Sequence, residues 1–478
     1  MLNIKPLVVD LDGTLIFTDM LHESVLRVLR DKPLSVSCIP FFLLKGKAAL
    51  KQYLASKTDF YPSSLPYNEE LLNWLKQQKT NGRQLILCTA TDKKTANSIA
   101  EHLQIFDEVI ASDGNTNVAG QKKAEVLEQR FGRSGFDYVG NSEPDLKVWE
   151  RANRAIVVNA STRLTNKAKK LFDVEQVFPA KVLSFSTWRR VLRVHQWLKN
   201  LLLCVPLFAA HQLFNGEAWI SLIIAFLSFS MCASSVYITN DLLDLESDRQ
   251  HPRKKNRPFA SGLVPIWVGV SLVPLLLLIS LLIGNQVGGD FIPWLIFYFI
   301  LTAFYSWGLK RLMLVDCLAL AMLYTLRIVA GAAAVNHTLS FWLLAFSVFL
   351  FLSLAFVKRY AELEIQLLSG KEKIHGRGYF TTDAPLIQTM GITSGYVSVL
   401  VLALYLNSDA VIKLYKTPEV VWAAVPVMLF WVSWMWIQAH RGEMHDDPLI
   451  FAIKDKASLF AGLLFAAILA IGAIGWQW

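Results

Sequence analysis

Residues 240–262 read NDLLDLESDRQHPRKKNRPFASG and follow directly on a long apolar run. In a helix, a spacing of four places Asn240, Asp244 and Asp248 on one stripe, with Asp241 at its edge. Carboxylates gathered in this way repel one another unless cations lie between them, and Mg²⁺ prefers such oxygen ligands. Because ionisable residues at the end of a membrane helix are functional by default, we expect Mg²⁺ at the three aspartates and substrate at Asn240.

The loop that follows is strongly basic, which suits phosphate oxygens. We expect Arg249, Arg253 and Arg257 to bind substrate there, with His251, Lys254 and Lys255 nearby. A cluster of carboxylates and guanidinium groups fits a diphosphate held with Mg²⁺. The alternative is a solvated helix end without a ligand, which the regular spacing of the acidic residues disfavours.

The run before Asn240 is one of nine apolar runs of near-bilayer length. A spanning helix needs roughly 17–25 residues. We expect nine spans, at about 198–214, 218–238, 264–284, 291–307, 312–334, 340–357, 387–406, 419–438 and 458–476.

The composition agrees with a membrane protein. Of the 478 residues, 54% are hydrophobic and 18% charged, whereas soluble domains carry roughly a quarter charged residues. Lys and Arg number 47 against 38 Asp and Glu, for a net charge of +9. The balance suits anionic headgroups or phosphorylated substrates, and no nucleic-acid motif accompanies it. The five cysteines lack CxxC spacing, which argues against disulfides and zinc.

Loop charges predict the orientation. With a cytosolic start and no signal peptide, the outside loops carry only Lys413 and Lys416, while the inside loops carry fifteen basic residues. The positive-inside rule therefore predicts an integral, multi-pass protein of the inner membrane with a cytosolic N-terminal domain. The fifteen are Arg249, Arg253, Lys254, Lys255, Arg257, Lys310, Arg311, Lys358, Arg359, Lys371, Lys373, Arg377, Arg441, Lys454 and Lys456.

The first 180 residues have ordinary charge density and alternate strands with helices. Short buried strands are expected at 7–9, 84–88, 108–110, 136–139 and 155–158, with helices between them. Such alternation predicts a mostly parallel, doubly wound α/β sheet. We expect this domain over 1–160 with a helical cap over about 20–75, a basic linker over 161–186, and an all-α membrane domain over 187–478.

Asp10 and Asp12 follow the first strand directly, in the run DLDGT. Acidic residues at the carboxyl end of such a strand lie at the usual ligand site of an open α/β sheet. The run resembles the first motif of haloacid-dehalogenase (HAD) phosphatases. Three later features match that family in order: Thr89 after the strand QLILC, Lys123 in KAEVL, and GNSEPD with Asn141 and Asp145.

The resemblance implies a phosphatase. Asp10 would attack phosphorus and form an aspartyl-phosphate, and Asp12 would act as acid and then base. Thr89 and Lys123 would hold the phosphoryl oxygens. Mg²⁺ would lie at Asp10, Asp12, Asn141 and Asp145. Asn141 departs from the family, which has an acidic residue there; the alternative is a weakened domain that acts as a scaffold.

The run at 240–262 resembles UbiA-type intramembrane transferases, as do Tyr305 and Lys310 in YSWGLKR. That family has nine helices around a central cavity. Its aromatic prenyltransferases carry a second acidic run, DxxxD, where this chain reads Lys358-Arg359-Tyr360-Ala361-Glu362. The KRYAEL run resembles the branch acting as decaprenyl-phosphate phosphoribosyltransferase, whose donor is 5-phosphoribosyl 1-diphosphate and whose acceptor is a polyprenyl phosphate. Lys358, Arg359 and Glu362 would then face the substrate.

Three functions remain. The first is a bifunctional enzyme that makes a polyprenyl-phosphoryl 5-phosphoribose and removes its 5-phosphate. The second is a prenyltransferase that uses an aromatic or other acceptor, with an unrelated phosphatase domain. The third is a membrane scaffold without activity. Lys358 and Glu362 in place of two aspartates favour the first, and two largely intact acidic clusters disfavour the third.

Overall fold

The computed structural model describes residues 5–59, 61–368, 370, 377–444 and 447–475. Lys371 and Lys373 of the charge argument lie outside the described residues. The chain divides into two compact units. The first joins Met1–Leu192 with Tyr237–Val273, and the second joins Arg193–Val236 with Pro274–Trp478.

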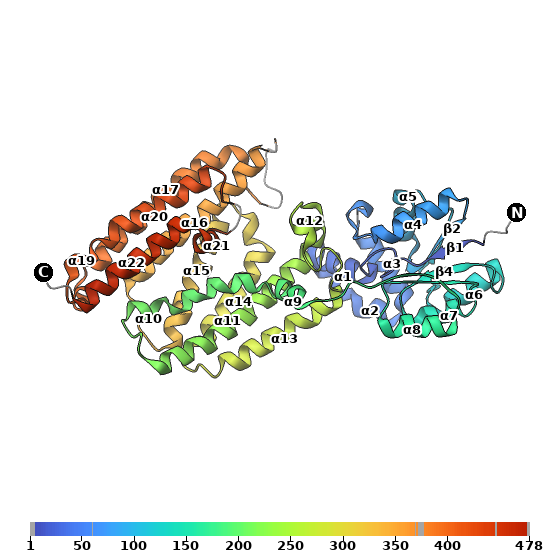
Figure 1. Ribbon diagram of the computed structural model, residues 1–478, viewed down its shortest axis with the longest axis horizontal. Coiled ribbons are helices and arrows are strands. Elements are labelled where there is room, and N and C mark those ends of the chain that lie inside the picture. Colours follow the sequence, from blue (N-terminus) through green and yellow to red (C-terminus); the bar gives the residue numbers. More distant parts are fainter. Residues whose placement is uncertain (1–4, 60, 369, 371–376, 445–446, 476–478) are drawn as a thin grey trace. The chain divides into compact units, whose positions relative to one another are not determined.

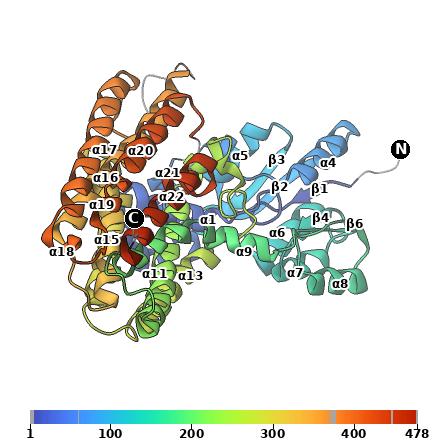
Figure 2. The same ribbon diagram turned by 60° about the vertical axis from the view of Figure 1, so that its left-hand side comes forward.

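The first unit is built on one parallel sheet of six strands in the order β3-β2-β1-β4-β5-β6 (Figures 1 and 2). The chain alternates sides along each strand, so Leu7 and Val9 face one layer of helices and Val8 the other. This confirms the doubly wound α/β domain. The strands are β1 Leu7–Val9, β2 Leu85–Asp92, β3 Glu108–Ser112, β4 Asp137–Gly140, β5 Ala155–Val158 and β6 Val174–Phe178.

Helices cover both faces of the sheet. α4 (Glu69–Thr80) and α5 (Lys93–Leu103) bury Leu75 and Ile99 against Leu7 and Val9. On the other face, Leu127 and Leu164 pack with Val8. The helices of that face are α6 (Gly120–Phe131), α7 (Leu146–Trp149) and α8 (Thr162–Leu171).

The sheet extends into the segment 161–186 that we expected to be a linker. Helix α8 and strand β6 occupy 162–178, and β6 pairs with β5 through Val157↔Val177 and Val158↔Phe178. The expectation is corrected because Val174, Val177 and Phe178 pack against the core and form a short edge strand, in which only Glu175 and Gln176 are exposed. The next helix is α9, Phe185–Val191.

The expected helical cap follows β1. Asp19 caps α1 by accepting from the backbone N–H of Leu21 and His22. Val28 of α1 packs with Leu50 and Leu54 of α3 in a small separate core. The cap consists of α1 Met20–Asp31, η1 Pro33–Cys38, α2 Ile39–Leu44, α3 Lys47–Lys57 and η2 Pro62–Ser64.

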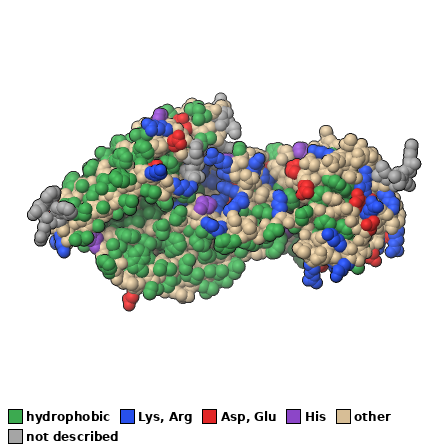
Figure 3. Space-filling view, in the orientation of Figure 1, with side chains coloured by type: hydrophobic (Ala, Val, Ile, Leu, Met, Phe, Trp, Pro, Cys, Tyr) green, Lys and Arg blue, Asp and Glu red, His purple; other side chains and the backbone are tan. Residues whose placement is uncertain are grey.

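Seven helices in the described part of the chain are long and apolar enough to cross a membrane. Hydrophobic side chains cover much of the helical part of the surface in Figure 3. The candidate spans are Gly216–Leu243 (α11), Ile266–Gly284 (α13), Val315–Ala334 (α15), Phe341–Leu368 (α16), Thr381–Leu406 (η7 Thr381–Asp383 with α17 Ala384–Leu406), Pro418–His440 (α19 Pro418–Val421 to α20 Ala424–His440) and Lys456–Ile474 (α22).

One of the nine expected spans differs. Helix α14 (Phe291–Trp307) has the bounds of the expected span 291–307 and, with 17 residues, is shorter than the seven candidate spans above. The expected span 198–214 is broken into a 3₁₀ helix, η4 (Val194–Cys204), and the short helix α10 (Val205–Ala209). Pro206 lies at the start of α10, where its missing N–H does no harm, whereas inside one long helix it would remove a hydrogen bond.

Short helical segments connect the longer ones. They are α12 Leu245–Gln250, η5 Lys254–Asn256, η6 Leu309–Arg311, α18 Asp409–Ile412 and α21 Pro448–Lys454.

Candidate active sites

The first site lies at the carboxyl ends of β1, β2 and β4. Lys123 of α6 donates to Asp10 Oδ1, with 2.7 Å between the atoms, and to the hydroxyl of Tyr138 at 3.0 Å. That hydroxyl in turn donates to Asp145 Oδ1 at 2.9 Å. A buried ammonium thus joins the two carboxylates through one tyrosine. The structure brings Asp10, Lys123 and Asp145 together as the motif order predicts.

Burial raises the pKa of Asp10 to about 6, although the charge of Lys123 opposes the shift. Burial alone would lower the pKa of Lys123, but the charges of Asp10 and Asp145 raise it above its usual value. Lys123 therefore stays protonated and can hold a phosphoryl oxygen. Asp10 is ionised above about pH 6, as a nucleophile must be.

Asp12 occupies a separate position at the start of the cap. Its Oδ1 accepts from the backbone N–H of Met20 at 2.9 Å, and its Oδ2 accepts from Thr91 Oγ1 at 2.7 Å. Burial, and then the charge of Asp19, raise its pKa to about 7. A carboxyl with a pKa near the working pH can both give and take a proton, so Asp12 suits acid–base work.

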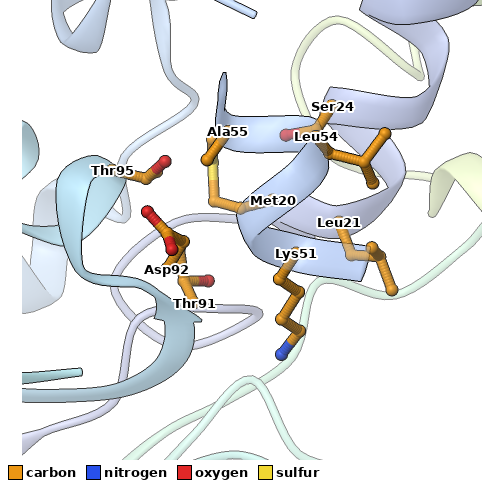
Figure 4. A pocket seen from close by; sticks show the side chains of 9 residues that line it. All are labelled: Met20, Leu21, Ser24, Lys51, Leu54, Ala55, Thr91, Asp92 and Thr95. Atoms are coloured by element: carbon orange, nitrogen blue, oxygen red, sulfur yellow. The ribbon is translucent and has the colours of Figure 1, made fainter. Parts of the chain in front are cut away.

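Thr89 is fully buried in β2, and its Oγ1 accepts from the N–H of Thr91 at 3.0 Å. A small pocket lined by Thr91 and Asp92 opens between the cap and the sheet (Figure 4). Lys51 of α3 lines this pocket, and its ammonium donates to the carbonyl of Ala90 at 2.6 Å. Lys51 could not be recognised from the sequence, because a lone lysine on a helix belongs to no motif.

Asp145 organises the loop after β4. Its Oδ2 accepts from the N–H groups of Asn141 and Ser142 and from Ser142 Oγ, at 3.1, 3.0 and 2.7 Å. Asn141 lies against Gly13: a Cβ on Gly13 would come 2.2 Å from Asn141 Nδ2. Glycine is therefore required in DLDGT, both for this approach and for its φ of +72°.

Among the described residues, no group of three or more His, Cys, Asp and Glu side chains is arranged to hold a metal ion. The chemistry around Asp10 nevertheless fits Mg²⁺. Asp10 is buried and Asp12 half-buried, and the pKa values of both are raised because the ionised form is poorly solvated there, a cost that a cation relieves. Asp145, whose oxygens accept from Tyr138, Asn141 and Ser142, holds the loop after β4 in place.

The second site is the Asp-rich segment. Helix α11 ends at Leu243, and Asp244 separates it from α12. Backbone bonds still run from Asp244 to Asn240 and from Asp248 to Asp244, at 2.9 and 2.8 Å, so the spacing of four is kept. The break is a local kink that leaves the expected stripe in place.

Arg257 joins two of the aspartates. Its Nη1 lies 3.1 Å from Asp241 Oδ1 and 2.6 Å from Asp248 Oδ2, and both aspartates are 2% exposed. Their oxygens thus converge on one positive group, as oxygens that bind a divalent cation must. The donor set fits Mg²⁺ for this reason.

The other basic residues of the segment lie differently. Arg253 is exposed at the start of η5. Arg249 is buried: its Nε donates to the carbonyl of Ala260 at 2.8 Å, and its guanidinium pairs with Glu23. The guanidinium expected to meet phosphate is thus held by protein groups.

In the second unit, Lys358 lies on α16 with its Nζ 3.5 Å from Asp447 Oδ2. Asp447 also accepts from Lys199 Nζ at 2.7 Å and from the Tyr324 hydroxyl at 2.9 Å. The Asp447 side chain is 7% exposed, while that of Lys358 is 29% exposed. Part of the Lys358 side chain therefore stays accessible, while the buried carboxylate of Asp447 holds its ammonium group in place.

The sequence did not reveal Asp447 or its link to Lys199. A single aspartate before the short helix α21 has no spacing to mark it, and its partners are far away along the chain. Two lysines on one carboxylate make this a positively charged place, as expected for Lys358.

Arg359 is fully buried, with its Nη2 2.5 Å from Asp316 Oδ2, and it also pairs with Glu362. Arg377 pairs with the same two carboxylates, at 3.4 Å from Asp316 and 3.5 Å from Glu362. Arg359 is thus part of an internal ion-pair network that holds Glu362. Its expected contact with substrate has no support in this geometry.

The YSWGLKR run, which also resembles the UbiA family, contacts this ion-pair network. Tyr305 of α14 accepts from Arg377 Nη1 at 3.4 Å, and Lys310 lies on η6. Tyr379 donates to Asp316 Oδ1 at 2.5 Å. The residues YSWGLKR and KRYAEL, far apart in sequence, therefore share partners through Arg377 and Asp316.

Comparison with known proteins now identifies the class. Residues 201–454, more than half of the chain, match the UbiA prenyltransferase family. The chain belongs to that family and is an integral, multi-pass membrane protein. It joins a parallel α/β domain to a UbiA-type transferase domain.

The similar proteins cover the two parts differently. The chain is 36% identical to protein y4nM of Sinorhizobium fredii over 97% of its own length and 90% of that protein. It is 30% identical to the decaprenyl-phosphate phosphoribosyltransferase of Mycolicibacterium smegmatis, over 60% of this chain and 90% of that one. A phosphoserine phosphatase complex with bound substrate matches at 15% identity and a TM-score of 0.28, over 37% of this chain and 94% of that one.

Proposed function

We propose that the chain transfers 5-phosphoribose from 5-phosphoribosyl 1-diphosphate to a polyprenyl phosphate, and that its HAD domain then removes the 5-phosphate. The observation that carries this proposal is the fixed, accessible base Lys358 at a position where prenyltransferases of this family have an aspartate. A second phosphate on the donor needs such a base, whereas a prenyl diphosphate does not. The likeness to the mycobacterial phosphoribosyltransferase supports the same choice.

The transfer needs little acid–base chemistry. The bond between ribose C1 and the diphosphate oxygen breaks, and its electron pair leaves with the diphosphate. An oxygen of the acceptor phosphate forms the new bond to C1, and no base is needed because that oxygen is already anionic. Mg²⁺ held by Asp241, Asp244 and Asp248 would supply charge stabilisation to the leaving diphosphate.

The residues of this chain orient the two ends of the donor. Arg257, which forms ion pairs with Asp241 and Asp248, binds the diphosphate. Lys358 takes the 5-phosphate, with Asp447 and Lys199 fixing its position. Arg359 serves to hold Glu362 and does not bind substrate itself.

The phosphatase step uses the first site. Asp10 attacks phosphorus, so that an aspartyl-phosphate forms as the bond to the ribose oxygen breaks. Asp12 gives its proton to that oxygen and later takes one from the attacking water. Lys123 pairs with the phosphoryl oxygens, and Lys51 lies at the rim where the rest of the substrate would enter. Mg²⁺ beside Asp10 and Asn141 would offset charge there.

The product of the first reaction is a phosphomonoester, which is the class of compound that a HAD phosphatase hydrolyses. Both sites must then face the same side of the membrane. The charge of the loops supports the cytosolic side of the inner membrane for both. The first activity thus supplies the substrate of the second, which explains why one chain carries both domains.

The second candidate is transfer of a prenyl group to an aromatic or other acceptor, which the family membership favours. One experiment separates the two. The purified chain is incubated with radiolabelled 5-phosphoribosyl 1-diphosphate and a polyprenyl phosphate, and in parallel with a prenyl diphosphate and an aromatic acid, with Mg²⁺ or EDTA. Label in the lipid fraction, dependent on Mg²⁺, is expected from the first pair. Prenylation of the aromatic acid alone would overturn the proposal.

A further inference from the structure

Helix α1 of the cap carries an acidic side chain buried against the Asp-rich segment, within the first compact unit. Glu23 accepts from both terminal nitrogens of Arg249, with 2.6 Å between Oε1 and Nη2 and 3.3 Å between Oε2 and Nη1. The Glu23 side chain is 3% exposed and that of Arg249 is 6% exposed. Thr18 donates to the same Glu23 Oε1 at 2.8 Å. A two-pronged, desolvated pair of this kind fixes orientation as well as distance.

A second set of ion pairs joins the same two helices, but here the acidic residue is on α12 and the basic residues are on α1. Glu246, one turn before Arg249 on α12, lies with its Oε2 3.2 Å from Arg30 Nη2 and 3.7 Å from Arg27 Nη2. Glu23, Arg27 and Arg30 share one face of α1. Each charged side chain of α1 in this contact therefore faces a side chain of opposite charge on α12. This complementarity admits one register of the two helices.

The loops next to these helices pack equally closely. Gly262, at the end of the HPxxxxRPxxxG run, has φ +69°, and a Cβ there would come 2.4 Å from Phe17 Cβ and 2.5 Å from its carbonyl oxygen. Phe17 lies three residues before Met20, the first residue of α1. Arg249 Nε also donates to the carbonyl of Ala260 in the same run. Backbone of the transferase loop thus rests directly on backbone of the cap.

The first turn of α1 contacts both sites. The first N–H of α1, on Met20, donates to Asp12 Oδ1 at 2.9 Å. One turn later, Glu23 holds Arg249, and the preceding residue on α12 is Asp248, which pairs with Arg257. The path from the phosphatase acid to the metal-binding aspartate is a short run of hydrogen bonds and one helical turn.

We propose that helix α1 of the phosphatase cap is a positioning element of the transferase: through Glu23 and Arg249 it holds Asp248 and the 257–262 loop in the geometry that binds the donor diphosphate. Arg249 acts through Glu23 and is not a substrate ligand. The transferase then needs the cap whether or not the phosphatase is active. The kinetic part of this inference rests on the proposed function, while the contact itself does not.

The test is Glu23→Gln in the full-length chain, a change that keeps the shape and removes the charge. The KM for the donor diphosphate is expected to rise about tenfold, with kcat changed less than about threefold, since the aspartates remain but are less well placed. Hydrogen exchange over 241–262 is expected to become faster, while exchange in β1 and β4 stays unchanged. Unchanged KM and unchanged exchange would overturn the proposal.

Two further variants separate positioning from general damage. Glu101→Gln, on an exposed part of α5, is the matched control and should change neither readout. Arg249→Glu should act like Glu23→Gln or more strongly, and Glu23→Arg with Arg249→Glu should recover most of the lost donor affinity. A double variant as impaired as the worse single one, with normal exchange over 241–262, would also contradict the proposal. If no variant transfers phosphoribose at all, the exchange data still decide the contact, so that failure of the proposed function is told apart.

Discussion

Lys358 Nζ lies 3.5 Å from Asp447 Oδ2, on a carboxylate that Lys199 and Tyr324 also bind. This relationship explains how a lysine can replace an acidic residue in a membrane transferase without leaving an unpaired charge. The buried aspartate pairs the charge of Lys358, and the exposed part of Lys358 remains free to meet a ligand phosphate. In the proposed function, this replacement selects a donor with a second phosphate.

We predict that Lys358→Ala harms donor binding. A desolvated charged hydrogen bond that loses one partner costs about 2–5 kcal/mol, so the KM for 5-phosphoribosyl 1-diphosphate should rise at least about thirtyfold. Initial rates over a range of donor concentrations measure this. Lys413→Ala, at an exposed position, is the control. Retained donor affinity together with new use of a prenyl diphosphate would show that the phosphoribosyl assignment is wrong.

Asp248→Asn, and equally Asp244→Asn, should remove transferase activity with the fold intact. Asn keeps the shape but supplies no charge to a cation, and charge stabilisation of the diphosphate is worth several kcal/mol, so turnover should fall at least about a hundredfold. The measurement is turnover at limiting Mg²⁺, with Asp290→Asn at the exposed start of α14 as control. Wild-type turnover in both variants would remove the basis for a metal site here.

The raised pKa of Asp12 predicts a dependence of stability on pH. Its folded-state pKa, about 7, lies above the ordinary 3.8, so the folded state favours the protonated form. This contribution is fully present below about pH 4 and is lost as the pH rises through 7. Asn cannot ionise and can keep bonds to Met20 and Thr91. Asp12→Asn should therefore be the more stable chain at pH 8 in EDTA.

At pH 8, the free energy of unfolding of Asp12→Asn is expected to exceed that of the wild type by at most about 4 kcal/mol, the value that follows from a pKa raised from 3.8 to about 7. The difference should vanish near pH 4. Thermal unfolding midpoints of wild type and variant, measured in EDTA between pH 4 and 8, provide the comparison. Mg²⁺ should narrow the difference at pH 8 by stabilising the ionised wild type. Equal midpoints at pH 8 in EDTA would mean that Asp12 is not a buried acid of this kind.

The sequence predicted the parts whose physics is local. Leu7-Val8-Val9 before DLDGT, and the long apolar helices, carry their own periodicity, so the sheet and most spans were predicted correctly. Strand β6 was missed because it is short and lies at the sheet edge, with Glu175 and Gln176 exposed between its apolar residues. The broken first span was missed because apolar composition does not register Pro206.

The candidate sites divide in the same way. Asp10 and Asp145, which follow strands, and Lys123 on α6 belong to family motifs and come together as expected. The Asp447–Lys199 and Glu23–Arg249 pairs could not be predicted, because each joins residues more than 200 positions apart. Arg359 was expected at the substrate from the resemblance of the KRYAEL run, but Asp316 holds it inside the protein.

We propose above that one chain makes a phosphoribosyl lipid and then removes its 5-phosphate. The most direct test is mass spectrometry of the lipid product formed by wild type and by Asp10→Asn from 5-phosphoribosyl 1-diphosphate and polyprenyl phosphate with Mg²⁺. Asn cannot form the aspartyl-phosphate, and Asp10 takes no part in the transfer. The wild type should therefore yield the ribosyl lipid without its 5-phosphate, and the variant should accumulate the 5-phosphorylated lipid at an almost unchanged transfer rate. A wild type that yields only the 5-phosphorylated lipid, or no ribosyl lipid at all, would contradict the claim.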